Sequence, residues 1–186
     1  MFIITGLGNF GKEYVNTPHN AGFMFVDKFR EYLVQNSNLQ ISEWEDERKL
    51  FLSELCKIKK GGELIGILQK PLTYMNNSGS AVRLLLKKHK ADKYILAHDD
   101  LDIPLDTCKI HKGKSPKGHR GILSVEGVLP DKDFLRVRIG IENRKERVIP
   151  GEEYVLIPYS KKELVVLKGC IERSLIDLIQ SADLKL

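Results

Sequence analysis

The sequence has few cysteines and no close pair of them. Cys56, Cys108 and Cys170 are the only three, and no C-x-x-C spacing occurs. An odd number of widely spaced thiols in apolar or strand-like surroundings is typical of reduced, structural cysteines rather than of a disulfide framework. We therefore expect free thiols, and the spacing gives little support to a cysteine that ligates a metal or acts in catalysis.

Long apolar runs are also absent. No stretch approaches the roughly 20 residues that span a bilayer. The start, MFIITGLG, has neither the basic region nor the small-residue cleavage pattern of a signal peptide. We therefore expect a cytoplasmic protein without a membrane partner. The 42% hydrophobic and 30% charged content fits a globular protein, and 186 residues fit one domain over residues 1–186. A net charge of +5 permits a polyanionic partner without requiring one.

Strand patterns alternate with helix patterns along the chain. Apolar or alternating runs predict strands at 2–7, 51–58, 63–70, 94–100, 108–112 and 134–141, with a turn at 60–62 that makes the second and third a hairpin. Helical spacing of apolar residues predicts helices at 20–35, 78–89, 122–129 and 161–179. Only the polar stretch 35–49 is predicted as a long exposed connection. This order predicts an α/β fold, a single-domain three-layer sandwich with a mixed, mostly parallel central sheet flanked by helices.

The segment TGLGNFG, residues 5–11, has the G-x-G-x-x-G spacing of dinucleotide-binding proteins. That function needs a helix directly after the third glycine and an acidic residue at the next strand end. Pro18 leaves room for only one helical turn, and Asp27 falls inside a predicted helix. The segment instead places Asn9 at a strand end, where ligand crevices form, although Asn9 and Asn20 taken singly also suit turn and cap positions.

Four motifs in order resemble the bacterial-type peptidyl-tRNA hydrolases. They are GLGNFGKEYVNTPHNAGF, KPLTYMNNSG, AHDDLDIP and FLRVRIGI. The resemblance runs from Phe2 to about Ile141 and continues weakly in GEEYVL and the terminal helix. It implies an esterase that cleaves the bond between a peptide and the 3′-terminal ribose of tRNA, without metal or cofactor. We expect a monomer with no obligate protein partner.

The resemblance also implies roles for individual residues. His19 would be the catalytic base and Asp99 its partner, with Asn9 and Asn76 holding the reacting end of the substrate. A neutral imidazole can take a proton from water, and a carboxylate on its other nitrogen fixes the tautomer. Amide groups can bind a carbonyl or a developing oxyanion. The further substrate-binding positions are Tyr14, Asn20, Met75, His119 and Arg120.

The loop KGKSPKGHRG, residues 112–121, departs from the family pattern. Arg120 stands where the family has an asparagine, and His111 where it has a lysine that grips the terminal phosphate of tRNA with the arginine matching Arg138. A guanidinium donates hydrogen bonds but cannot accept them. The substitutions concentrate cations, which predicts either a phosphate-binding surface or a solvated basic loop. The residues proposed to bind phosphate are Lys109, His111, Lys112, Lys114, Lys117 and Arg138, with Arg136 nearby.

Two alternatives remain beside the hydrolase. One is an RNA-binding relative without catalysis, a role known in this superfamily for chloroplast intron splicing; a pure binding module would not need the imidazole and its carboxylate. The other is a divalent-metal cluster of Asp99, Asp100 and Asp102 with His98, which would need further ligands placed by the fold. His98 follows an apolar run and is predicted to pack in the core.

Overall fold

The first predicted strand lies at the centre of the sheet. In the computed structural model, which describes residues 1–113, 118–144, 148–184 and 186, β1 (Phe2–Gly6) pairs in parallel with β5 (Glu63–Pro71) and β6 (Lys93–Pro104). All residues of β1 are buried. Burial on both faces explains why the segment is continuously apolar instead of alternating.

The remaining strands extend the sheet on both sides. The strand order is β2-β4-β5-β1-β6-β8-β7, and β3 (Glu45–Asp46) also pairs with β4. The other bounds are β2 (Gln40–Ile41), β4 (Ser53–Lys60), β7 (Cys108–Lys112) and β8 (Leu135–Glu142). The centre, β5-β1-β6-β8, is parallel, whereas β4 and β7 run antiparallel to their neighbours. The predicted mixed sheet with a parallel centre is confirmed.

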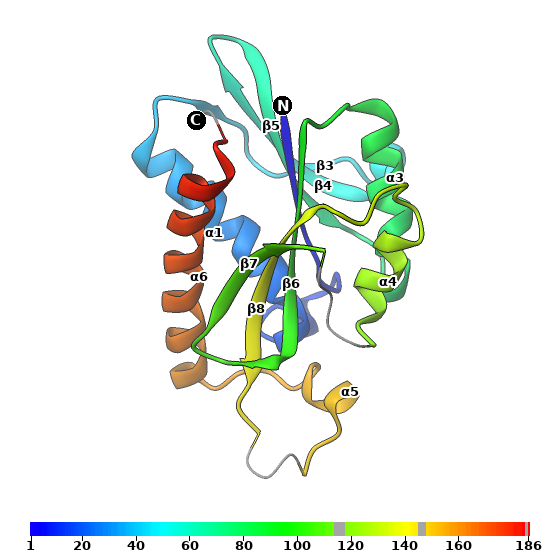
Figure 1. The fold of residues 1–186 in the computed structure, drawn as a ribbon, viewed down its shortest axis with the longest axis vertical. Coiled ribbons are helices and arrows are strands. Elements are labelled where there is room, and N and C mark those ends of the chain that lie inside the picture. The colour runs from blue at the N-terminus through cyan, green and yellow to red at the C-terminus, as the bar shows by residue number, and fades with distance from the viewer. Residues whose placement is uncertain (114–117, 145–147, 185) are drawn as a thin grey trace.

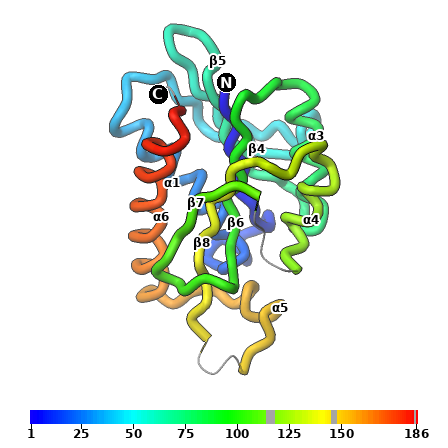
Figure 2. Tube along the Cα trace, in the orientation of Figure 1, coloured from blue at the N-terminus to red at the C-terminus, as the bar shows by residue number. Residues whose placement is uncertain are grey.

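Helices cover both faces of this sheet, as Figures 1 and 2 show. On one face α1 (Ala21–Asn36) and α6 (Lys161–Ala182) enclose the largest apolar core, and on the other α3 (Ser78–Lys88) and α4 (Arg120–Glu126) enclose two smaller ones. The short helices are η1 (Lys12–Tyr14), η2 (Pro18–Asn20), η3 (Met75–Asn77), α2 (Arg48–Phe51) and α5 (Gly151–Tyr154). Among the described residues, no helix has the length and apolarity needed to cross a membrane.

Close backbone packing fixes the segment after β1. A Cβ atom on Gly6 would lie 2.2 Å from the carbonyl oxygen of Gly22 in α1. The absence of a side chain therefore lets the end of β1 and the start of α1 touch. This contact holds the loop between them, which carries Asn9 and His19, against the end of the sheet.

Two expectations from the sequence are wrong. The stretch 35–49 is not simply a long connection, because β2 and β3 within it pair with β4. Cys108 and Cys170 are not free thiols: they form a disulfide between β7 and α6, with their Cα atoms 6.2 Å apart. Cys108 points to the α6 side of the edge strand, where the helix presents Cys170. Only Cys56 remains free, and it is buried.

Candidate active site

The predicted polar residues meet at the carboxyl ends of the parallel strands. The loop after β1 carries Asn9 and His19, the loop after β5 carries Asn76, and β6 itself carries Asp99. The segment after β8 leads to α5. Because ligand crevices in α/β sheets open at this end of the strands, the topology brings together residues far apart in sequence.

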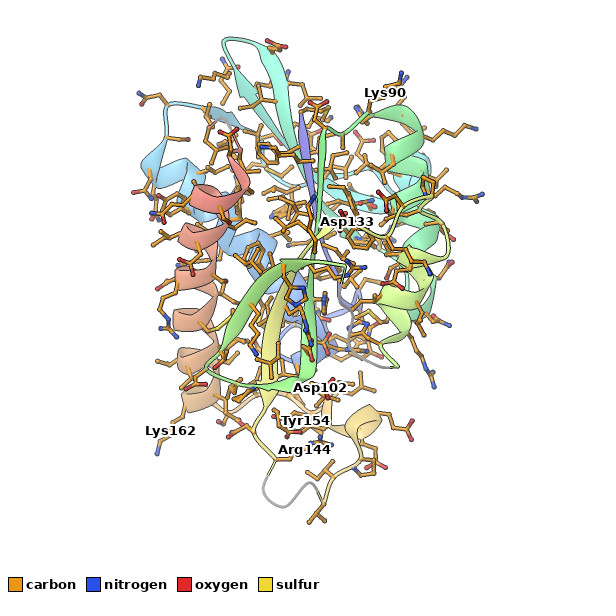
Figure 3. The ribbon with its side chains drawn as sticks, viewed as in Figure 1. Lys90, Asp102, Asp133, Arg144, Tyr154 and Lys162 are labelled. Carbon is orange, nitrogen blue, oxygen red and sulfur yellow. A yellow bond between two sulfur atoms is a disulfide. The ribbon has the colours of Figure 1, made fainter. Side chains whose placement is uncertain are left out.

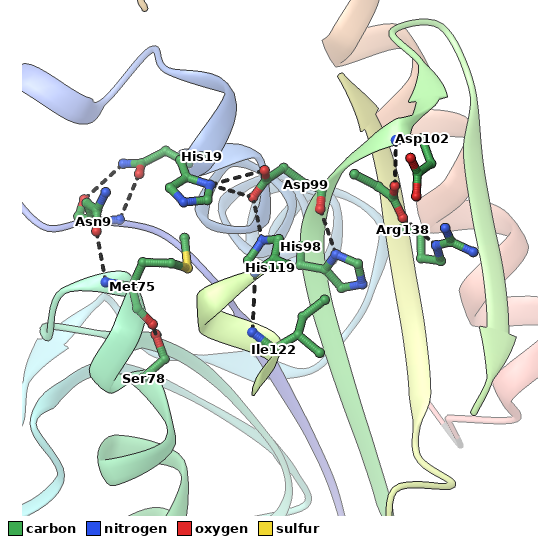
Figure 4. Close-up of polar contacts among 12 residues, drawn as sticks. Asn9, His19, Met75, Ser78, His98, Asp99, Asp102, His119, Ile122 and Arg138 are labelled. Carbon is green, nitrogen blue, oxygen red and sulfur yellow. Dashed lines mark hydrogen bonds and ion pairs between the residues drawn. The ribbon is translucent and has the colours of Figure 1, made fainter. Parts of the chain in front are cut away.

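His19 and Asp99 form the centre of this site (Figure 4). The Nδ1 atom of His19 lies 3.0 and 3.1 Å from the two carboxylate oxygens of Asp99. The backbone N–H of His19 also donates to the carbonyl oxygen of Val155, at 2.9 Å. When Nδ1 carries the proton that Asp99 accepts, Nε2 keeps its lone pair and faces away from the carboxylate.

The two groups shift each other's protonation. Burial alone would lower the pKa of His19, but the charge of Asp99 and its hydrogen bond outweigh burial, so this pKa is raised. Burial would raise the pKa of Asp99, but His19 and His119 hold it well below the usual range of a carboxyl group. Asp99 is therefore ionised at neutral pH, which favours the imidazolium form of His19 when a proton arrives.

His119 binds the same carboxylate from the other side. Its Nε2 lies 2.9 Å from Oδ1 of Asp99, and its Nδ1 accepts from the backbone N–H of Ile122, at 3.3 Å. The second contact caps the N-terminus of α4 and assigns the ring proton to Nε2. Both ring nitrogens of His119 are thus engaged within the protein, and the ring holds Asp99 in place.

His98 is a core residue, as predicted. It is fully buried, and its Nδ1–H donates to the backbone carbonyl oxygen of Asp99, at 2.8 Å. Burial, with the nearby His119, lowers the pKa of His98 to about 3. The ring therefore stays neutral and supports the backbone of Asp99.

Asn9 is oriented by hydrogen bonds on both its backbone and its side chain. The Asn20 side chain accepts from the Asn9 N–H at 2.8 Å and donates to the Asn9 carbonyl oxygen at 3.0 Å. The Asn9 Oδ1 accepts from the backbone N–H of Met75, at 2.9 Å. Its Nδ2 has no partner among the described residues and remains available to a ligand.

Asn9, His19, Asp99 and His119 line a cavity of about 580 Å³. Met75, in the wall of the cavity, is buried with 5% of its surface exposed, whereas Asn76 is exposed. The structure brings most of the predicted residues together here: Asn9, His19, Met75, Asn76, Asp99, His119 and Arg120 all contribute to the lining. Two predicted substrate contacts do not line it. Tyr14 lies in η1 outside the cavity, and Asn20 acts on the backbone of Asn9.

The sequence prediction missed part of the cavity wall. Tyr74, whose ring lies tilted against that of Phe10 with ring centroids 5.0 Å apart, stands inside the motif KPLTYMNNSG. The opposite wall comes from β6 and α5, and the short motif GEEYVL was the only signal for α5. The missed lining residues are Tyr74, Leu101, Asp102, Gly118, Gly151, Glu152, Val155 and Leu156.

The proposed phosphate-binding cations differ in availability. Lys109 is exposed and has no ion pair among the described residues, whereas Lys112 lies 3.6 Å from Asp133. Arg138 is 7% exposed; it pairs with Asp100, and its Nη1–H donates to Nε2 of His111 at 3.0 Å. Lys114 and Lys117 lie outside the described residues.

Arg136 does not belong to this surface. Its side chain is fully buried and pairs with Glu126 at 2.8 Å. The guanidinium also stacks on the ring of Phe134. It therefore serves the packing of β8 against α4.

The donor atoms of His19, Asp99 and His119 lie within 4.8 Å of one another, close enough for a metal ion. Hydrogen bonds already occupy them. A cation there would displace the Nε2 proton of His119 to Nδ1, where it would face the Ile122 N–H, so the arrangement suits ring protons better than a metal. The alternative metal cluster considered from the sequence includes Asp100, whose carboxylate already forms an ion pair with Arg138.

The dinucleotide alternative does not agree with the geometry. Within residues 5–36, all of which the structure describes, η1 spans three residues and is not an α-helix. Asp27 lies inside α1 and pairs with Lys70.

A sequence model of the family described as peptidyl-tRNA hydrolase matches residues 3–183. The chain belongs to this family. It is 37% identical to the peptidyl-tRNA hydrolase of Aquifex aeolicus over 186 residues, covering 98% of this chain and 90% of the relative. It is 38% identical to that of Campylobacter jejuni, covering 99% and 94%.

A solved structure supports the same family. The crystal structure of peptidyl-tRNA hydrolase from Acinetobacter baumannii superposes with a TM-score of 0.80 at 29% identity, covering 100% of this chain and 91% of that one. The resemblance drawn from four motifs is therefore confirmed across nearly the whole chain.

Proposed function

We propose that this protein hydrolyses the ester bond between the peptide and the tRNA in peptidyl-tRNA, with His19 as general base. The observation that carries the proposal is the His19–Asp99 pair, held 3.0 Å apart at the wall of a cavity that the Asn9 amide also lines. Family membership supports the substrate, and the residues support the chemistry.

The residues present allow direct attack by water. Nε2 of His19 takes a proton from water as its oxygen bonds to the ester carbonyl carbon, and Asp99 stabilises the resulting imidazolium. The Nδ2 groups of Asn9 and Asn76 donate to the carbonyl oxygen as its negative charge grows. When the bond to the ribose oxygen breaks, the imidazolium returns the proton to that oxygen, which leaves a peptide acid and free tRNA.

The tRNA itself is proposed to lie over the exposed cations of β7. Lys109 is exposed and has no ion pair among the described residues, and Lys112 is exposed on the same strand, 3.6 Å from Asp133. Arg138 of β8 lies behind them, buried and paired with Asp100. Such groups bind phosphates and do not read base sequence. We retain the expectations of a monomer, of a cytoplasmic location and of no cofactor as parts of this proposal.

Release of an N-blocked amino acid from aminoacyl-tRNA tests the catalytic claim. His19→Ala should abolish release, because the base is lost, yet should leave tRNA binding largely unchanged. His89→Ala is the control: it removes an imidazole at the end of α3, outside the cavity lining. If the unaltered protein binds tRNA without any turnover, the alternative of a non-catalytic RNA-binding relative replaces the hydrolase.

A further inference from the structure

Arg120 is a cation at the wall of the active-site cavity. It is the first residue of α4, directly after His119, and its side chain is exposed. No ion pair or hydrogen bond engages its guanidinium among the residues that the structure describes. Arg136 and Arg138, by contrast, are both paired with carboxylates. A fixed, uncompensated positive charge in a cavity favours an anionic ligand.

The charge of Arg120 reaches the reacting centre. Its electrostatic effect on His19 lowers the pKa of that imidazole, against the larger effects of burial and of Asp99. The guanidinium cannot accept a hydrogen bond, so it cannot orient water in the way that an amide oxygen does. It offers instead a planar pair of N–H donors, the geometry that matches two oxygens of a phosphate.

The cavity lining carries charges of both signs. Asp102 of β6 and Glu152 of α5 also line the cavity, and both are exposed. A phosphodiester would be repelled there and attracted to Arg120. The electrostatics of the lining therefore favour a phosphate beside Arg120.

The face of the sheet that α4 covers also carries Lys109 of β7. His98, whose ring packs edge-on against His119, is paired in register with Arg138 of β8, and Arg138 with Lys109 of β7. Residues opposite one another on neighbouring strands share a face. A nucleic acid strand that leaves the cavity past Arg120 thus meets Lys109 on the same face.

We propose that Arg120 binds the phosphodiester that joins the terminal adenosine to the nucleotide before it, so that the cavity selects esters of an oligonucleotide over esters of a nucleoside. This rests on the proposed ester hydrolysis. Arg120 is then a specificity-determining residue of the reaction. Asn9 and Asn76 retain their proposed role of donating hydrogen bonds to the ester carbonyl oxygen.

Two minimal substrates, one with and one without phosphodiesters, isolate the contribution of the phosphate contact. One is the N-acetyl-aminoacyl ester of the trinucleotide CCA, and the other is the same ester of adenosine alone. In Arg120→Asn, the ratio of kcat/KM for the trinucleotide to that for the adenosine ester should fall about tenfold, as expected when a charge-assisted hydrogen bond is lost. Arg120→Lys, which keeps the charge but not the fork, should give an intermediate ratio. Lys90→Asn changes the net charge equally at the far end of the molecule (Figure 3) and should leave the ratio unchanged.

Binding of the CCA trinucleotide without an aminoacyl group, measured by calorimetry, tests the same contact without turnover. Arg120→Asn should weaken it about tenfold. An unchanged ratio with unchanged CCA binding would overturn the proposal. An equal slowing of both esters would also overturn it, because Arg120 would then act on the reacting end. If the unaltered protein hydrolyses neither these esters nor N-acetyl-aminoacyl-tRNA, the proposed function fails, while CCA binding still decides whether Arg120 holds the phosphate.

Discussion

At the scale of single residues, Asp99 organises the site as the acceptor of hydrogen bonds from three histidines. His19 and His119 bind its carboxylate, and the His98 ring donates to its carbonyl oxygen. Asp99 is nearly fully buried, and two imidazoles compensate its desolvated charge. The carboxylate thereby fixes the tautomer of His19 that a general base requires.

The pH dependence of hydrolysis follows from this pair. Because the pKa of His19 is raised, kcat/KM should fall on the acid side with a midpoint above the 6.5 of an ordinary histidine. The direction is set by chemistry: protonation of Nε2 removes the base, so activity is lost as the pH falls. A pH–rate profile of the unaltered enzyme measures this midpoint.

Asp99→Asn should move that midpoint to lower pH, because Asp99 raises the pKa of His19. It should also reduce kcat by roughly 10²- to 10⁴-fold, the range of general base catalysis. Asp102→Asn removes a carboxylate of the same strand that is not among the groups shifting the pKa of His19, and it should leave the midpoint in place. A midpoint unmoved in Asp99→Asn would contradict the assigned partnership.

At the scale of elements, the edge of the sheet is tied to a helix on its face. The disulfide between Cys108 and Cys170 joins β7 to α6 across 62 residues of sequence. The neighbouring residue Lys109 belongs to the proposed tRNA surface on the other face of β7. The bridge therefore holds the strand that presents this surface.

Reduction should lower the free energy of unfolding by about 2–4 kcal/mol, because the open chain gains conformational entropy when unfolded. Urea denaturation with and without a reductant measures the difference. The double variant Cys108→Ser, Cys170→Ser should be indifferent to the reductant and should match the reduced protein. Equal midpoints for the unaltered protein in both conditions would show that the two thiols are not bridged in solution.

The disulfide is one feature of the fold that local sequence patterns could not predict. Periodic patterns placed α1, α3 and β8 within a few residues, because each is long enough to show its period. β2 and β3 span two residues each and show none. The pairing of Cys108 with Cys170 depends on how α6 lies on β7, which local patterns do not contain.

The candidate site was predictable to a similar degree. The family resemblance identified His19, Asp99 and Asn9, because each of them lies within one of the four motifs that carry it. They did not show that Asn20 acts on Asn9, nor that α5 forms the opposite wall, because both facts depend on the meeting of four strand ends.

At the scale of the whole molecule, the net charge is +5, but several of the cations are already paired with carboxylates. Arg136 is buried with Glu126, and Arg138 is neutralised by Asp100. Lys109 is exposed and unpaired among the described residues. Affinity for tRNA should therefore depend on a few identifiable cations more than on overall charge.

Lys109→Gln should weaken tRNA binding at low salt and reduce the steepness of log K against log[salt] by about 0.9, the loss of one phosphate contact. Lys162→Gln removes the same charge at the start of α6, on the other side of the sheet, and serves as the control (Figure 3). Titrations at several salt concentrations measure both slopes. If the two variants lose slope equally, general attraction binds the tRNA; if only Lys109→Gln loses slope, Lys109 on the β7 face contacts a phosphate of the tRNA.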